Sequence, residues 1–279
     1  MTTTLRPTGP LQQGADGARA RSYEVCVNSR PVGAVDLRTD DAYGPVCGVI
    51  GGLRIDEQDR GRGRGTVAAL AAEEVLRGWN CDQVRIAVPA GAAAAVRMAG
   101  ALGYTLHNSH LVKELPGQPP ELPAGVEGRP MREDEFRLWR ARGIADYAQT
   151  WVDRGMAEDR ARAKSEADHR EALPEGPATP GAAIDVLVGD GRVLGHVWTG
   201  EARSDPGRHV AFVFDVEVAE EHRGRGHGRS LMLLAEREAL AAGARQIKLN
   251  VLTANTPAVR LYASLGYRPA EHFYGKHLL

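Results

Sequence analysis

The feature that most constrains the fold of this chain is an internal repeat. The 279-residue sequence carries one pattern twice, 163 residues apart: Arg60–Gly65 reads RGRGRG and Arg223–Gly228 reads RGRGHG. Between Arg60–Tyr104 and Arg223–Tyr267, 16 of 45 aligned positions are identical without a gap. A duplication of this length, in a chain long enough for about two domains, predicts two copies of one fold.

The two copies differ at positions where reactive side chains stand in one of them. Asn255 and Tyr262 of the second copy align with Ala92 and Ala99 of the first. An amide can hold a ligand by hydrogen bonds and a phenol can donate a proton, whereas alanine can do neither. The sequence therefore predicts chemistry in the second copy and none in the first.

Composition excludes several classes of protein. The net charge is −1, with 25% charged and 43% hydrophobic residues, so no global charge favours nucleic acid or an anionic membrane. Cys26, Cys47 and Cys81 form no CxxC pair, which predicts neither a zinc site nor a disulfide framework. No run of about 18 apolar residues predicts a membrane span. We therefore expect a cytoplasmic protein without a metal.

Both halves show the same alternation of strand and helix patterns. Hairpin turns are predicted at Asn28-Ser29-Arg30 and at Gly189-Asp190-Gly191, between short apolar runs. Val46–Ile55 and Val210–Val218 read as strands that run into the two glycine loops. A helix, a strand, a second helix and a last strand follow each loop. This order predicts the α/β class, with a mixed sheet flanked by helices in each half.

Proline and glycine mark the predicted boundaries. Residues 1–21 lack periodicity and are expected to form a flexible tail, and the proline-rich segment 116–128 is expected to be a linker. The domains are then 22–115 and 129–279. The second domain opens with two predicted helices that the first lacks, Arg132–Arg154 and Met156–Leu173.

The glycine loops are candidate anion sites. A strand that enters a glycine-rich turn and then a helix exposes backbone N–H groups and a partial positive charge. The spacing is neither that of a P-loop nor the GxGxxG of a dinucleotide fold. Taken alone, such a segment could also be a solvated basic turn or an RGG-like nucleic-acid contact. Its repetition in a strand–loop–helix context favours anion binding.

Two motifs together resemble a known family. Both loops read Arg-x-x-Gly-x-Gly, and Asn255–Tyr267 reads NTPAVRLYASLGY. In this order the motifs are similar to those of the GNAT (Gcn5-related) N-acetyltransferases, over nearly all of 126–279 and more weakly over 22–115. The resemblance implies two tandem GNAT-like domains, each a mostly antiparallel mixed sheet flanked by helices, and acetyl-CoA as the cosubstrate.

The resemblance also implies roles for residues near the second loop. The backbone around Glu217 would pair with the pantetheine arm, and the loop would wrap the pyrophosphate. The implied cofactor-binding residues are Val216, Val218, Arg223, Gly224, Arg225, Gly226, His227, Gly228, Arg229 and Asn255. The first loop keeps Arg60, Gly61, Gly63 and Gly65, so it could still hold a pyrophosphate without catalysis.

Tyr262 and Glu217 are the candidate catalytic residues. The resemblance implies that Tyr262 protonates the departing thiolate, which a phenol protonated at pH 7 can do. Glu217 is the predicted proton acceptor, acting through water. The alternatives are a core aromatic for Tyr262, a solvated strand residue for Glu217 and a helix cap for Asn255. Asp215 shares the strand face of Glu217 because strand side chains alternate.

The acceptor site is expected in 132–173 and neighbouring loops. Tyr147, Trp151 and Trp198 are candidate walls and Asp215 a candidate contact, although the same aromatic residues could belong to the core. We expect acetyl transfer to a primary amine of a small molecule in a ternary complex. The alternatives are a protein or peptide N-acetyltransferase and a CoA-binding scaffold without turnover. Nucleic-acid or membrane binding is not expected, and the protein is expected to be a monomer or homodimer.

Overall fold

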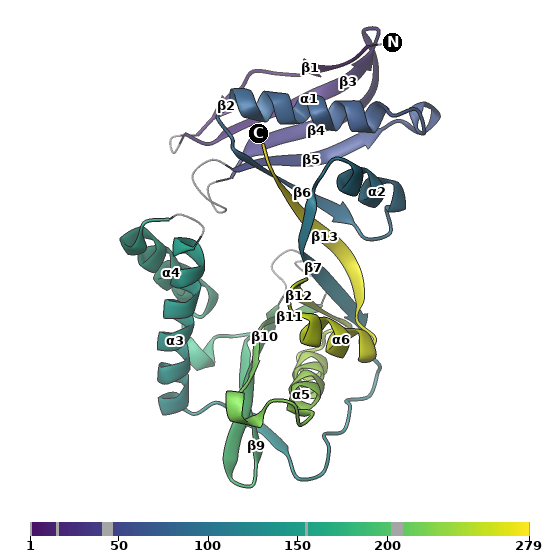
Figure 1. Cartoon of the computed structure of the whole chain (residues 1–279). Coiled ribbons are helices and arrows are strands. Elements are labelled where there is room, and N and C mark those ends of the chain that lie inside the picture. The colour runs from purple at the N-terminus through teal and green to yellow at the C-terminus, as the bar shows by residue number, and fades with distance from the viewer. Residues whose placement is uncertain (1, 15–16, 41–46, 154–155, 202–208, 279) are drawn as a thin grey trace. The chain divides into compact units, whose positions relative to one another are not determined.

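The chain forms two compact units (Figure 1). The computed structural model describes residues 2–14, 17–40, 47–153, 156–201 and 209–278. Unit 1 comprises Met1–Asn108, Asp153–Met156 and Glu271–Leu279, and unit 2 comprises Ser109–Val152 and Ala157–Ala270. Val46 and Arg154, at the ends of two predicted elements, lie outside the described residues. Each unit combines a mostly antiparallel mixed sheet with helices, which confirms the predicted α/β class.

Unit 1 has the strand order β1-β3-β4-β5-β6-β13, with β2 beside β3. Its strands are β1 (Thr3–Pro7), β2 (Gln12–Gln13), β3 (Arg19–Val27), β4 (Arg30–Thr39), β5 (Cys47–Ile55), β6 (Gln83–Pro89) and the end of β13 (Arg268–His277). Its helices are α1 (Arg64–Gly78) and α2 (Ala93–Ala101). The core fills with valine, leucine and alanine side chains of these strands and of α1.

Unit 2 has the strand order β7-β12-β11-β10-β9-β8. Its strands are β7 (Thr105–Glu114, of which it holds the last residues), β8 (Glu127–Pro130), β9 (Ala183–Gly189), β10 (Arg192–Glu201), β11 (Val210–Val218) and β12 (Gln246–Leu252). Its helices are α3 (Glu133–Val152), α4 (Glu158–Ala172), α5 (His227–Ala241) and α6 (Thr256–Ser264). The helices α3 and α4 are the two that the sequence predicts only for the second half.

Strand alternation divides the interior of unit 2 into two faces. Ile184, Val186 and Trp198 cluster with side chains of α3 and of the chain after α4. Leu187 and Val197 point the other way and cluster with side chains of α5. Successive strand residues face opposite sides of a sheet, so one pattern serves two hydrophobic layers. The face of β9–β11 toward α3 and α4 is the one that carries the candidate site.

The predicted hairpins are confirmed. Asn28 and Ser29 connect β3 to β4, and both have positive φ, 47° and 69°. Asp190 and Gly191 connect β9 to β10 with φ of 48° and 71°. Positive φ at both central residues matches the twist of the flanking strands, which is why Asn, Asp and Gly are favoured there.

The N-terminal segment differs from the expected flexible tail. Thr3–Pro7 forms β1, which pairs antiparallel with β3 from Thr3–Val27 to Pro7–Tyr23. Leu5 packs on the core of unit 1, and Arg6 makes an ion pair with Glu24 at 2.6 Å. The polar composition of this segment does not indicate a strand, because the outward side chains of an edge strand are polar. The segment is ordered by its pairing with β3.

The last strands of the two repeats are exchanged. Glu271–His277 of β13, from the second repeat, pairs antiparallel with β6 in unit 1 (Figure 1). The end of β7, from the first repeat, lies beside β12 in unit 2, where the backbone N–H of Leu115 donates to the carbonyl of Arg245 over 2.9 Å. The predicted cut at 116–128 separates the repeats in sequence, whereas each compact unit needs a strand from the other repeat.

A buried ion pair anchors each exchanged strand. Lys113 of β7 binds Glu236 of α5 at 2.6 Å, and Lys276 of β13 binds Glu73 of α1 at 2.8 Å. The two pairs are related by the 163-residue offset of the repeat. Each lysine also lies over a tyrosine ring, with 5.5 Å from Lys113 to the Tyr267 centroid. A cation–π contact and an ion pair thus hold each strand at its place.

Asp185 is a buried carboxyl whose charge destabilises unit 2. Its side chain is 5% exposed, and burial and the charge of Glu238 raise its pKa to about 6. The folded state then keeps a proton that the unfolded state releases, so the free energy of unfolding falls as pH rises from about 4 to about 6. We expect Asp185→Asn to stabilise the protein by about 2 kcal/mol at pH 7.5 and little at pH 4.

Urea unfolding of Asp185→Asn at the two pH values measures this difference. Asp190→Asn is the matched control, because Asp190 lies in the β9–β10 turn and asparagine tolerates its positive φ. An equal change in the free energy of unfolding at both pH values for Asp185→Asn would indicate a packing effect. It would contradict the proposed titration of Asp185.

Candidate active site

The second glycine loop joins β11 to α5 through a 3-10 turn at Glu220–His222. Gly224 and Gly226 have φ of 76° and 87°, and a Cβ added to either would meet no atom within 4 Å. Glycine is therefore required for the backbone conformation, and the space beside the loop is open. The side chain of Arg223 folds back, and its Nε donates to the carbonyl of Val218 over 3.1 Å. This open loop at a helix start fits a phosphate group.

Asn255 caps helix α6. Its Oδ1 accepts from the backbone N–H of Ala258 over 3.2 Å, with φ of −82° and ψ of 67° at Asn255. Ala92 holds the same place before α2, with φ of −84° and ψ of 66°, and offers no side-chain cap. The predicted cap is present, so backbone geometry is conserved between the repeats while the amide is not.

The shared geometry predicts opposite effects of reciprocal substitutions. We expect Asn255→Ala to lower the free energy of unfolding of unit 2 by about 1 kcal/mol, because the cap is lost. Ala92→Asn should raise that of unit 1 by about 0.5–1 kcal/mol, because the backbone is already in the capping conformation. Chemical denaturation of the two variants tests this, and a loss of stability in Ala92→Asn would contradict it.

Strand β11 is irregular where the site forms. Trp198 of β10 pairs with Asp215 and Thr199 pairs with Val213, so Phe214 is an extra residue in β11. The parallel register with β12 runs only from Val210–Gln246 to Val213–Leu249. A bulge bends its strand and re-aims the following side chains. The backbone of residues 214–218 therefore lies beyond the register with β12, at the position that the resemblance assigns to the pantetheine arm.

Tyr262 sits in the core of unit 2 on α6. Its side chain is 6% exposed and its ring lies 5.9 Å from that of Tyr267. Burial and the negative charge of Asp215 raise the pKa of the Tyr262 phenol above its ordinary value. The phenol is thus protonated at neutral pH, as a proton donor must be.

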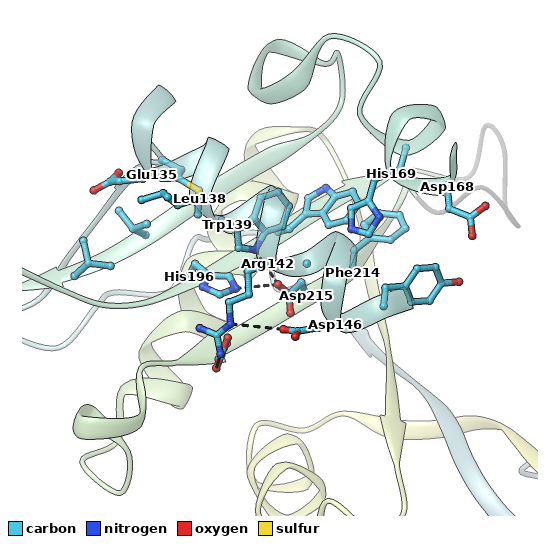
Figure 2. Close-up of a pocket in the computed structure, with 18 of the residues that line it drawn as sticks. Glu135, Leu138, Trp139, Arg142, Asp146, Asp168, His169, His196, Phe214 and Asp215 are labelled. Atoms are coloured by element: carbon cyan, nitrogen blue, oxygen red, sulfur yellow. Dashed lines mark hydrogen bonds and ion pairs between the residues drawn. The ribbon is translucent and has the colours of Figure 1, made fainter. Parts of the chain in front are cut away.

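A cavity of about 770 Å³ lies between α3, α4 and the sheet of unit 2 (Figure 2). Strands β9–β11 provide its floor, including Trp198, Phe214 and Asp215, and α3 and α4 its walls. Glu217 lines the same cavity, as the alternation along β11 predicts, while Val216 packs on the other face. The volume is that of a small-molecule site.

Asp215 accepts two hydrogen bonds at the floor of the cavity. Nε2 of His196 lies 2.8 Å and Nε1 of Trp139 lies 3.0 Å from Oδ2 of Asp215. Figure 2 shows both rings beside the carboxylate. Burial disfavours the charge of Asp215, but the hydrogen bonds from His196 and Trp139 outweigh it, so the pKa of Asp215 lies below its ordinary value. The carboxylate is therefore ionised and paired with an imidazole.

Glu217 has different partners. Its Oε1 lies 3.4 Å from Nη2 of Arg142 and 3.3 Å from Nη2 of Arg223. Arginine stays charged at all relevant pH values and stabilises the carboxylate anion. Glu217 is thus engaged by two guanidinium groups, whereas Asp215 faces an imidazole.

The predicted aromatic walls divide between cavity and core. Tyr147 and Trp198 line the cavity. Trp151 is 4% exposed and does not line it, since its ring packs on Tyr147 at 5.7 Å and under Lys164 at 5.0 Å. The sequence analysis misses His196 and Trp139. The signal for His196 is its place two residues before Trp198 on β10, which puts both side chains on one face.

Unit 1 lacks each of these polar groups at the matching positions. The backbone places are preserved: Gly33 pairs with Ile55 as Gly195 pairs with Val218. Small residues in unit 1 stand at the positions that match the candidate site residues, with Ala34 for His196, Gly52 for Asp215, Ala92 for Asn255 and Ala99 for Tyr262.

The first glycine loop keeps its backbone conformation, but one of its arginines is engaged in a buried ion pair. Gly61 and Gly63 have φ of 73° and 72°, and Nε of Arg60 donates to the carbonyl of Ile55 over 2.8 Å. Arg64 is buried in an ion pair with Asp59, which also binds Arg30 at 2.8 Å. The first loop thus offers one arginine less to an anion than its sequence indicates.

A profile of the acetyltransferase (GNAT) family matches residues 5–104 and 146–267, which is most of the chain. The chain belongs to the GNAT acetyltransferase family. The two matches coincide with the two repeats, and the enzymes of this family use acetyl-CoA. The chain is therefore a tandem GNAT protein and an acetyltransferase, as the motifs predict.

Two relatives and one solved structure are similar to this chain over most of its length. Mycothiol acetyltransferase from Thermobispora bispora is 33% identical over 221 residues, which are 74% of this chain and 68% of that protein. The protein of the same name from Saccharomonospora viridis is 28% identical over 96% of this chain and 86% of its own. A tandem GNAT protein from the clavulanic acid biosynthesis pathway shares the fold, with a TM-score of 0.53, 20% identity, and 95% of this chain and 85% of that chain covered. Among the described residues, no helix is long and apolar enough to cross a membrane.

Proposed function

We propose that this GNAT protein transfers the acetyl group of acetyl-CoA to a primary amine of a small molecule, by direct attack in a ternary complex. The observation that carries the proposal is the cavity beside β11. It lies in the unit that has Asn255 and Tyr262, and Asp215 and Glu217 line it. The other unit has Ala92 and Ala99 at the positions that match Asn255 and Tyr262.

The residues of unit 2 fit acetyl-CoA. The open loop at Gly224 and Gly226, with Arg223, Arg225 and Arg229 around it, would hold the pyrophosphate. The backbone of Val216–Val218 would pair with the pantetheine arm, because it lies beyond the register with β12. Asn255 would hydrogen-bond the arm through its amide while its Oδ1 caps α6. His227 and Gly228 begin α5 and add backbone donors.

Acetyl-CoA supplies an activated thioester when bound. Backbone N–H groups of β11 polarise the carbonyl at its acetyl end, a role that fixed donors in a dry site perform well. The amine in the cavity attacks that carbon, and the carbon–sulfur bond breaks. Tyr262 donates its phenolic proton to the departing sulfur, and the proton that the amine loses goes to a base in the cavity.

The base is Glu217, acting through water, or the Asp215–His196 pair, and a substitution at each separates them. We expect His196→Gln to lower kcat at pH 7 by roughly 10²-fold, because the imidazole beside Asp215 can take the proton. Glu217→Gln should lower kcat less than about 5-fold, because two guanidinium groups already engage its Oε1. Steady-state kinetics with an accepted amine measures kcat of both variants. A larger loss of kcat in Glu217→Gln than in His196→Gln would indicate that Glu217 is the base.

The cavity supports a small acceptor over a peptide. A volume of about 770 Å³ is within the range of sites that enclose small ligands. The alternative of a protein or peptide acceptor would need an extended groove.

The buried free cysteines, Cys26, Cys47 and Cys81, suit the cytoplasm that we propose as the location.

Release of free thiol from acetyl-CoA, followed over a panel of primary amines, tests the function. We expect turnover with at least one small amine and none with the corresponding alcohols. Calorimetry of acetyl-CoA binding to the full chain adds the stoichiometry. One site would fit a first loop weakened by the Arg64–Asp59 pair, and two sites would show that the loop at Arg60 still binds. Tight acetyl-CoA binding with no thiol release for any amine would favour a scaffold without turnover.

A further inference from the structure

Several exposed apolar side chains line the cavity of unit 2. Leu138 of α3, Val193 of β10 and Phe214 of β11 are 75%, 41% and 40% exposed, and all three line the cavity. Large exposed apolar side chains that line a concave surface indicate a binding site for an apolar ligand, which would bury them. The body of the acceptor is expected to be apolar for this reason.

Three aromatic rings form what we call the aromatic corner: Trp139, Trp198 and Phe214. Trp198 stacks on Phe214 with centroids 4.7 Å apart, and Trp139 meets Trp198 edge-on at 5.6 Å. Mutual packing fixes the rings, so their faces are preorganised for a ligand. Indole faces attract organic cations as well as apolar groups.

The charge at this corner is negative. Asp215 pairs with Trp198 across the β10–β11 ladder, and Trp139 and His196 donate to its Oδ2. The side chains of Trp139 and His196 are the partners of Asp215, whereas Glu217 and Asp146 each pair with Arg142. An ammonium entering the cavity would therefore find in Asp215 a carboxylate that it need not share with an arginine.

We propose that the acceptor is a primary ammonium carried on an aromatic or aliphatic body, and that Asp215 holds the ammonium inside the aromatic corner. The inference rests on the proposed function, since it takes this cavity as the acceptor site. Polyhydroxylated amines bind poorly, because the apolar walls leave their hydroxyl groups without partners. The ammonium first loses one proton through the Asp215–His196 pair to solvent, which frees the nitrogen lone pair for attack. The pair can then take the second proton once the carbon–nitrogen bond has formed.

Binding of three probes to the full-length protein tests the inference without turnover. The probes are 2-phenylethylamine, 2-phenylethanol and glucosamine, titrated calorimetrically with coenzyme A present. We expect 2-phenylethylamine to bind at least about tenfold more tightly than either of the others, since one lacks the charge and the other the apolar body. Equal affinities, or the tightest binding for glucosamine, would overturn the proposal.

Variants assign the preference to the named residues. Asp215→Asn should remove the advantage of the amine over the alcohol, and Phe214→Ser should lower the affinity for both phenyl probes by about fivefold. Glu166→Gln and Leu70→Ser are matched controls, a carboxylate on α4 and an exposed apolar residue on α1 that do not line the cavity. Unchanged binding in Asp215→Asn and Phe214→Ser would contradict the assignment.

The proposed function and the acceptor class fail in different ways. If the amine binds as expected but no amine releases thiol from acetyl-CoA, the transfer reaction is wrong and the binding site stands. If thiol is released with glucosamine and other polar amines but not with 2-phenylethylamine, the transfer reaction stands and the acceptor class is wrong.

Discussion

Replacement of Tyr262 by phenylalanine is expected to lower kcat by roughly 10²-fold while leaving the affinity for acetyl-CoA within about twofold. The phenol is 6% exposed and its pKa is raised by burial and by Asp215, so it carries a proton at neutral pH. Removing the hydroxyl keeps the ring in the core of unit 2 and deletes only the group that we propose as the proton donor. Steady-state kinetics and calorimetry with acetyl-CoA measure the two quantities.

The control for Tyr262→Phe is Tyr23→Phe in unit 1, which removes a hydroxyl from another buried tyrosine that takes no part in the proposed reaction. Unchanged turnover in Tyr262→Phe would show that another group protonates the sulfur. Equal losses in both variants would indicate a general effect on folding instead of proton transfer.

Replacement of Lys113 by methionine is expected to destabilise unit 2 by about 3 kcal/mol. Glu236, the partner of Lys113, has a side chain that is 1% exposed, and loss of the lysine leaves a buried carboxylate without its cation. The double variant Lys113→Met, Glu236→Gln should recover most of the loss, because no charge then remains to be compensated. Urea unfolding of the three proteins measures the free energies.

Hydrogen exchange locates the damage and tests the exchange of strands. Lys113 comes from the first repeat, but its partner Glu236 is on α5, so Lys113→Met should weaken protection in α5 and not in α1. Lys276→Met should do the opposite, because its partner Glu73 is on α1. Loss of protection in α1 on substitution of Lys113 would show that each repeat keeps its own last strand.

Local patterns were sufficient to predict much of the fold. The turn residues at Asn28-Ser29 and Gly189-Asp190-Gly191 identify hairpins because few residues adopt positive φ. The glycine loops identify the starts of α1 and α5 for the same reason. The loose tail was predicted wrongly at Thr3–Pro7, because an edge strand takes its order from pairing and not from its own composition.

The floor of the cavity was harder to predict. His196, Trp139 and Asp215 come together from β10, α3 and β11, and no short motif joins them. Their meeting depends on the bulge at Phe214, which shifts the register of β11 by one residue. A register shift of one residue reverses the face of every side chain, and the sequence of a single chain does not mark it.

Exchange of the last strands was beyond the reach of sequence reasoning for a different reason. Each repeat carries the same lysine, glutamate and tyrosine: Lys113, Glu73 and Tyr104 in the first, and Lys276, Glu236 and Tyr267 in the second. A lysine could form the same ion pair with the glutamate of its own repeat or with that of the other repeat. Only the positions of β7 and β13 in the two sheets distinguish them.

The exchanged strands bear on how such a gene can change. A recombination or truncation in the proline-rich segment 116–128 would yield two fragments, each without the strand that the other repeat contributes to its compact unit. A fragment whose own last strand does not take that place would expose a bare sheet edge, which invites aggregation. The second repeat therefore depends on the first for strand β7, although the first has Ala92 and Ala99 where the second has Asn255 and Tyr262.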